Sequence, residues 1–145
     1  MQSVINIHST PFFMLAGEVH NSNSSSTEVM EPIWQKAKDL NLNTLFLPVT
    51  WELLEPEEGK FDFRLVDGLI GQARKYDMHI GFLWFGAWKN AQFYYAPAWV
   101  KCNAERFWRA EVQKGKKKIN LPNFHGMPYT TLSSHCEATM KADSR

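Results

Sequence analysis

Polar and aromatic side chains that could recognise a ligand accompany three short apolar runs of this sequence. The runs are Pro11–Ala16, Thr44–Val49 and His79–Phe85. At or just beyond their ends stand carboxylate, imidazole, amide and indole groups, carried by Glu18, His20, Asn21, Trp51, Glu52, Trp84, Trp88 and Asn90. An indole can pack against the apolar C–H face of a sugar ring, while carboxylates and amides bind its hydroxyl groups. This combination, repeated at three places, favours a carbohydrate-binding pocket.

Each of these residues also has a purely structural interpretation when it is taken singly. A lone Trp at the end of an apolar run is more often part of the core than a platform for a sugar. Glu18 could be a buried carboxylate satisfied by backbone donors, and His20 could be a hydrogen-bonding residue of the fold. The joint occurrence of such groups at three successive runs is what favours a pocket.

The apolar runs predict the elements that must position these side chains. They have the length of strands and are nearly continuously apolar, which predicts strands covered on both faces, as in a parallel sheet. Serines 24–26 offer N-caps for a following helix, which Pro32 either opens or separates from a short preceding turn. Apolar residues recur at helical spacing twice, as Met30, Ile33, Trp34, Ala37 and Leu40, and, after Asp62 as the expected cap, as Val66, Leu69, Ile70 and Ala73.

Strands and helices thus alternate at a period of roughly 30 to 37 residues, which indicates βαβ units around a parallel sheet. A flavodoxin-like sheet and a (β/α)8 barrel both fit this pattern. In either fold, function collects on the loops after the carboxyl ends of the strands, where the candidate residues stand. No Gly-rich turn opens a helix after these runs, so neither a dinucleotide nor a phosphate loop is predicted.

The last part of the chain has a different character. Residues 103–145 contain no comparable apolar run, and we expect a long loop followed by the start of a helix near Ser133 or Ser134. The basic stretch Lys114–Lys118 is short, contains a glycine and has no interleaved aromatic residues. A solvated turn is therefore favoured over a nucleic-acid site.

The bulk composition is that of a soluble globular domain, with 145 residues, 44% hydrophobic and 21% charged, and a formal net charge of +1. This charge gives no reason to expect nucleic acid or an anionic membrane, and no apolar run is long enough to span a bilayer. No secretory signal is recognised, and the compartment stays open. The histidines lack ligand spacing and Cys102 and Cys136 are expected to be free thiols, so we predict no metal and no other cofactor.

Several motifs occur in a fixed order over residues 11–102. They are Gly17-Glu18-Val19-His20, Leu42-Asn43-Thr44, Trp51, Glu55-Pro56, Gly59, Phe61-Asp62-Phe63 and Tyr95-Ala96-Pro97-Ala98-Trp99. In this order they resemble the first three βα units of glycoside hydrolase family 35, a β-galactosidase family, and the related family 42 shares the middle part. The resemblance implies an α/β fold that is part of a (β/α)8 TIM barrel, with residues 1–145 as the N-terminal part of the catalytic domain.

The resemblance also implies hydrolysis of terminal β-galactosides with retention, by two glutamates about 5 Å apart. The acid/base follows Asn at the end of the fourth strand and the nucleophile ends the seventh. No Asn-Glu pair occurs in this chain, so we expect it to be truncated before both glutamates and inactive alone, retaining part of a sugar-binding rim. Glu52 stands where the family usually has Asn, and residues 84–90 replace a Cys-Ala-Glu motif, so the resemblance does not fix galactose specificity.

Two other interpretations of the sequence stay open. The chain could be a non-catalytic carbohydrate-binding or scaffold protein that keeps the strand-end pocket. Glu18 and Glu52 could also form a carboxylate pair in a degenerate site, although the resemblance gives neither residue a catalytic role. The oligomeric state is not predicted.

Overall fold

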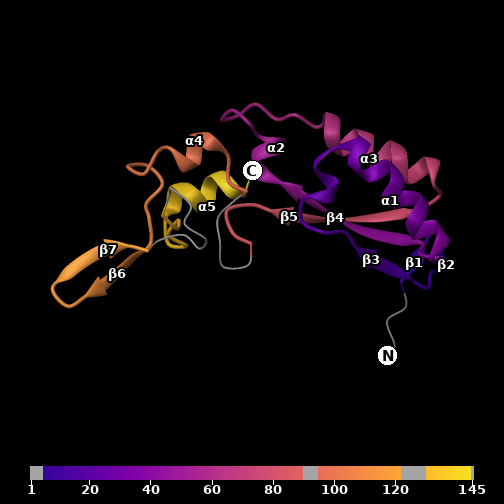
Figure 1. The fold of residues 1–145 in the computed structure, drawn as a ribbon, viewed down its shortest axis with the longest axis horizontal. Coiled ribbons are helices and arrows are strands. Elements are labelled where there is room, and N and C mark those ends of the chain that lie inside the picture. The colour runs from indigo at the N-terminus through magenta and orange to yellow at the C-terminus, as the bar shows by residue number, and fades with distance from the viewer. Residues whose placement is uncertain (1–4, 90–94, 122–129, 145) are drawn as a thin grey trace. The chain divides into compact units, whose positions relative to one another are not determined.

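The computed structural model describes residues 5–89, 95–121 and 130–144, and the chain forms two compact units (Figure 1). The first comprises residues 1–48 and 64–83, and the second comprises residues 49–63 and 84–145. Each unit has its own cluster of buried apolar side chains. The units are therefore described one at a time.

The first unit is organised around a parallel sheet in the order β3-β4-β5. The strands are β3 (Ala16–Glu18), β4 (Thr44–Thr50) and β5 (His79–Phe85). Ala16 lies opposite Thr44 in the parallel pairing of β3 with β4. The N–H of His79 donates to the carbonyl of Asn43 over 2.9 Å, so β4 and β5 begin at the same edge and run in the same direction. The predicted α/β fold with a parallel sheet is confirmed.

Two helices lie side by side over one face of this sheet (Figure 1). They are α1 (Thr27–Asp39), which follows the 3₁₀ turn η1 (Asn23–Ser25), and α3 (Arg64–Lys75). The core combines members of the predicted apolar stripes with two residues of β4, namely Met30, Trp34, Ala37, Leu69 and Ala73 with Leu45 and Leu47. Leu40, predicted as part of the first stripe, follows the end of α1 and is 72% exposed. The predicted serine cap is confirmed, since the Ser26 hydroxyl accepts from the N–H of Val29 over 3.2 Å. Burial of these stripes against the sheet is what holds both helices.

Two helix starts differ from the sequence prediction. Pro32 lies inside α1 and neither opens nor precedes it, because the serine cap fixes the start of the helix five residues earlier, at Thr27. A proline in the second turn removes one N–H donor, and packing against the sheet outweighs that loss. The second helix begins at Arg64, so Asp62 stands two residues before it.

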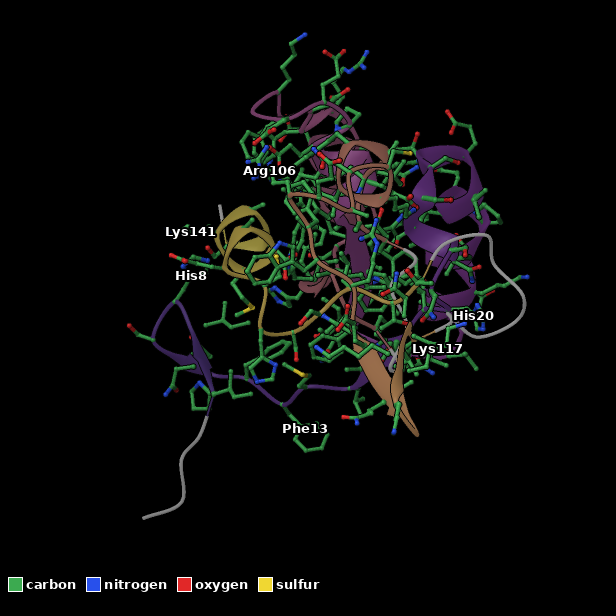
Figure 2. The ribbon with its side chains drawn as sticks, turned by 90° about the vertical axis from the view of Figure 1, so that its left-hand side faces the viewer. His8, Phe13, His20, Arg106, Lys117 and Lys141 are labelled. Atoms are coloured by element: carbon green, nitrogen blue, oxygen red, sulfur yellow. The ribbon has the colours of Figure 1, made fainter. Side chains whose placement is uncertain are left out.

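The first apolar run was predicted to be one strand, and this is wrong. Only its two ends belong to strands: β2 (Thr10–Pro11) pairs antiparallel with β1 (Asn6–Ile7), and β3 starts at Ala16. Phe13 between them is 79% exposed and points away from the ribbon (Figure 2). Coverage on both faces holds for β4 but not for β3 or β5. Both are edge strands, which receive side-chain contacts from a single neighbouring strand.

The second unit consists of short elements around a cluster rich in indoles. They are α2 (Trp51–Leu54), α4 (Ala98–Lys101), the hairpin strands β6 (Glu111–Lys114) and β7 (Lys117–Asn120), and α5 (Glu137–Asp143). The cluster contains Trp51, Val100, Phe107 and Leu132, with Trp88 and Trp99 packed against it. Cys102 and Cys136 are free thiols, as predicted.

Residues 103–145 were predicted to be a long loop before a helix, which misses the β6–β7 hairpin. Its register pairs Glu111 with Asn120 and Lys114 with Lys117. Gly115, at φ +62°, supplies the left-handed conformation that a tight hairpin turn requires. The basic stretch therefore contains the predicted turn, but its flanks are strands. The expected final helix is confirmed as α5, and it begins at Glu137 rather than at the serines.

Candidate functional site

Glu18 ends β3 on the face of the sheet that the helices leave uncovered. Its neighbour Gly17 faces the helices, because a Cβ built there would lie 2.9 Å from Cδ1 of Leu42 in the helix-side core. Successive side chains of a strand point to opposite faces, so Glu18 points the other way. Its register partner Phe46 follows Leu45, a helix-side core residue, and so shares the face of Glu18. Glu18 is exposed there and accessible to a ligand.

His20 and Asn21 continue the chain from β3 towards η1. His20 is exposed and Asn21 is half-buried, and the carbonyl of His20 accepts from the N–H of Asn23 over 2.9 Å. Glu18 and His20 line a common groove of about 350 Å³, which also contains Lys36. Glu18 and His20 thus border one groove beside α1, although the side chain of Glu18 points to the opposite face of the sheet. Asn21 is not among the residues that line the groove.

In the second unit, Trp51 is anchored by a buried carboxylate. Trp51 is 1% exposed and Glu55 is fully buried. Trp51 Nε1 donates to Glu55 Oε2 over 2.7 Å, and the N–H of Gly59 donates to Oε1 over 2.7 Å. The indole of Trp99 donates to the Glu55 carbonyl over 3.1 Å and packs edge-on against Trp51 at 5.5 Å. Glu55 therefore fixes two indoles and the turn that follows it.

Glu52, next to Trp51, is held by an ion pair. Its Oε2 lies 2.9 Å from Nζ of Lys101, whose side chain is 13% exposed against 39% for Glu52. The N–H of Glu52 also donates to the carbonyl of Tyr95 over 2.8 Å. This partly buried pair holds the carboxylate in one place while leaving part of it accessible, which suits a group that accepts a hydrogen bond from a hydroxyl.

Trp84 is bound to an aspartate that sequence analysis did not select. Trp84 Nε1 and the N–H of Ala87 each donate to Oδ1 of Asp143 over 3.1 Å. Gly86 permits this approach, because a Cβ built there would lie 1.8 Å from the same oxygen. Burial raises the pKa of Asp143, and the hydrogen bonds from Trp84 and Ala87 oppose that rise. Trp84 remains 45% exposed.

The remaining candidates are Trp88 and Asn90. Trp88 is half-buried and packs against the cluster of the second unit, which leaves part of its indole accessible. Asn90 lies outside the described residues. A further polar group that the prediction omitted is Thr50 at the end of β4, whose buried hydroxyl has no hydrogen-bond partner among the described residues. Its position just before Trp51 was the only signal in the sequence.

The described residues offer no evident place for a metal ion. Over residues 5–89, 95–121 and 130–144, no three His, Cys, Asp or Glu side chains gather in a way that could bind one. Nor does any helix in those ranges combine the length and apolar character needed to cross a membrane.

Comparisons with known proteins agree with this arrangement of strands. Residues 20–84 match the family model described as Beta-galactosidase, glycoside hydrolase family 42. No curated protein matches the chain. Among solved structures, the exo-β-1,4-mannosidase of Opitutaceae bacterium strain TAV5 is similar to 66% of this chain, with a TM-score of 0.55 and 14% identity. The chain spans 19% of that mannosidase.

These comparisons support a glycoside hydrolase relationship in the broad sense and do not single out family 35. The likeness to the mannosidase concerns the fold, since the identity is low. The matched residues 20–84 run from the turn after β3 to Trp84 near the end of β5, and therefore include the two helices and the two longer strands of the parallel sheet.

Proposed function

We infer that residues 1–145 contribute the first three strand–helix units of a β-galactosidase-type glycoside hydrolase barrel, together with part of its sugar-binding surface. The observation that carries this proposal is the match of residues 20–84 to a β-galactosidase family. It is supported by a parallel sheet whose strand ends carry exposed or half-exposed carboxylates, Glu18 and Glu52. Ligands of α/β folds bind at such ends.

In this proposal the polar residues bind hydroxyl groups and the indoles pack against the sugar ring. Glu18 and Glu52 accept hydrogen bonds from hydroxyls, and the ion pair with Lys101 holds the Glu52 carboxylate in position. His20 and Asn21 offer further polar groups beside Glu18. Trp84 and Trp88 are accessible in part and supply apolar surface, whereas Trp51 is buried.

The proposed chemistry of the whole barrel is hydrolysis with retention by a pair of glutamates. This chain contains no Asn-Glu pair, and Glu55 already accepts from Trp51 and Gly59. We therefore expect the 145-residue chain to bind a sugar without hydrolysing it. No turnover of a nitrophenyl β-galactoside by the purified chain is the expected result, and measurable turnover would contradict this part of the proposal.

The binding role is tested by titrating the chain with galactose and with mannose, and by comparing Glu18→Gln and Glu52→Gln with the unmodified chain. Each substitution keeps the shape and removes the charge, so each should weaken binding by about tenfold, as loss of a charge-assisted hydrogen bond does. Glu57→Gln is the control, because Glu57 is an exposed member of an ion pair with Lys60. Equal affinities for all three variants would overturn the proposed rim.

The absence of an Asn-Glu pair also favours a second candidate, a non-catalytic carbohydrate-binding protein. The two candidates differ in what the transcript encodes after Arg145. An in-frame apolar strand that ends in Asn-Glu is expected for the barrel enzyme, and a stop codon there is expected for the binding protein.

A further inference from the structure

The second unit contains a cavity of about 280 Å³ beside Trp84 and Asp143. The residues that bear on its chemistry are Trp51, Glu55, Phe61, Phe63, Trp84 and Asp143. Its size is close to the lower limit of small-molecule pockets, which suits a single monosaccharide better than an oligosaccharide.

Aromatic rings form an accessible apolar wall of this cavity. Phe61 and Phe63 stack with their ring centroids 6.1 Å apart and their planes 19° apart, and they are 42% and 52% exposed. Trp84, also exposed in part, belongs to the same lining. Such large apolar rings at a surface lose contact with water when a ligand with a C–H face packs on them.

The side-chain hydrogen-bond donors in the described lining of the cavity already donate to groups of the protein. Both lining indoles donate to carboxylates, Trp51 to Glu55 and Trp84 to Asp143. The hydroxyl of Ser144, also in the lining, donates to the Lys141 carbonyl over 3.3 Å. A ligand that brings its own donors therefore fits this lining better than one that needs donors from the protein.

The ionisable side chains in the described part of the lining are acidic. Glu55 and Asp143 are its ionisable members, and none of the described residues that line it is Lys, Arg or His. Lys141, two residues before Asp143, pairs instead with Glu137 at 2.7 Å. Partial burial strengthens the field of a carboxylate, and faces of Phe and Trp also attract cations.

We propose that this cavity binds a hexosamine, a sugar whose protonated amine pairs with Asp143 while its C–H face packs on Phe63 and Trp84. The inference rests on the proposed carbohydrate function and names a class of sugar for one part of it. An acetylated amine is neutral and larger, so N-acetylhexosamines should bind more weakly. A neutral hexose lacks the charge and binds more weakly.

The test is calorimetric titration of the whole chain with galactosamine, N-acetylgalactosamine and tetramethylammonium, at a pH where the amine is protonated. Galactosamine should bind about tenfold more tightly than its acetylated form, the size of effect that loss of one ion pair gives. Tetramethylammonium, a cation without a sugar ring, should bind more weakly than galactosamine. Equal affinity for the first two sugars, or an advantage of tetramethylammonium over galactosamine, would overturn the proposal.

Two pairs of variants locate the binding site. Asp143→Asn keeps an oxygen that can accept from Trp84 and Ala87, so the fold should persist while galactosamine affinity falls about tenfold. Glu137→Gln, on the same helix but exposed and paired with Lys141, should leave affinity unchanged. Phe63→Leu should weaken binding, with exposed Phe13→Leu of the first unit as its control. Unchanged affinity in Asp143→Asn would contradict the assignment.

The test of the cavity can fail or succeed independently of the test of the proposed sugar-binding rim. If Glu18→Gln and Glu52→Gln leave galactose binding intact while Asp143→Asn abolishes selectivity for galactosamine, the rim fails and the cavity stands. The reverse result retains the rim and removes the cavity.

Discussion

Two carboxylates of the second unit, Glu55 and Asp143, accept hydrogen bonds from indoles. Glu55 is fully buried and accepts from Trp51 Nε1 and from Gly59 N–H, each over 2.7 Å. A buried acceptor with two donors is costly to remove, because both donors are then left without a partner. This explains why a Glu-Pro motif stands four residues after Trp51.

Replacing Glu55 should accordingly destabilise the second unit. Glu55→Ala is expected to lower the free energy of unfolding by about 2–4 kcal/mol, from two orphaned donors and a cavity. Glu55→Gln should cost less, because one acceptor remains. Urea unfolding followed by Trp fluorescence measures both, with exposed Glu57→Ala as a control expected to change stability by about 0.5 kcal/mol or less. A Glu55→Ala chain as stable as the control would refute this role.

The stability of the folded chain should depend on pH through Asp143. Because burial raises its pKa in the folded chain, the folded state holds this proton more tightly than the unfolded state. Asp143 therefore makes its full contribution to the free energy of unfolding below the ordinary Asp pKa of about 3.9. That contribution is lost as the pH rises through the raised pKa of the folded chain. Asp143→Asn should match the unmodified chain at low pH and become relatively more stable towards pH 7. A difference that is constant with pH would contradict this linkage.

At the scale of elements, the hydrophobic pattern predicts the helices and strands that are buried and misses those that are exposed. The strands β4 and β5 and the helices α1 and α3 follow from apolar runs and stripes, because their side chains meet in one core. The β6–β7 hairpin is rich in exposed Lys and buries little apolar surface. Its sequence therefore contains no apolar run from which the strands could be predicted. The first strand was misplaced for the opposite reason, since Phe13 is apolar but exposed.

The contact between β4 and β5 makes a testable case of close packing. A Cβ at Gly81 would lie 2.6 Å from Cε1 of Phe46, whereas one at Gly71 in α3 would meet nothing within 4 Å. Gly81→Ala should therefore cost about 1–3 kcal/mol through displacement of the ring. Gly71→Ala should stabilise by up to about 1 kcal/mol through helix propensity. Thermal unfolding of both variants measures the contrast.

A double mutant checks the cause of the Gly81 effect. If the ring is the obstacle, Gly81→Ala should cost much less in a Phe46→Ala background than in the unmodified chain, because neighbouring residues couple. Additive effects of the two substitutions would show that Phe46 is not what Gly81 accommodates.

At the scale of the whole molecule, the sequence predicts the class of fold and the kinds of group at the strand ends, but not their partners. Glu18 and Glu52 are accessible as a binding role requires, while Trp51 is buried. Asp143 could not be selected, because it reaches Trp84 across 59 positions of sequence. Contacts between distant segments follow from tertiary packing, and local patterns carry no record of them.

We propose that this chain carries sugar-binding strand ends of a glycoside hydrolase barrel. The most direct measurement is titration of the isotopically labelled chain with galactose and mannose, followed by amide chemical shifts. The account predicts saturable shifts at Glu18, His20, Glu52 and Trp84, with the exposed hairpin residue Lys117 unaffected. Shifts absent at all four, or confined to the β6–β7 hairpin, would contradict it.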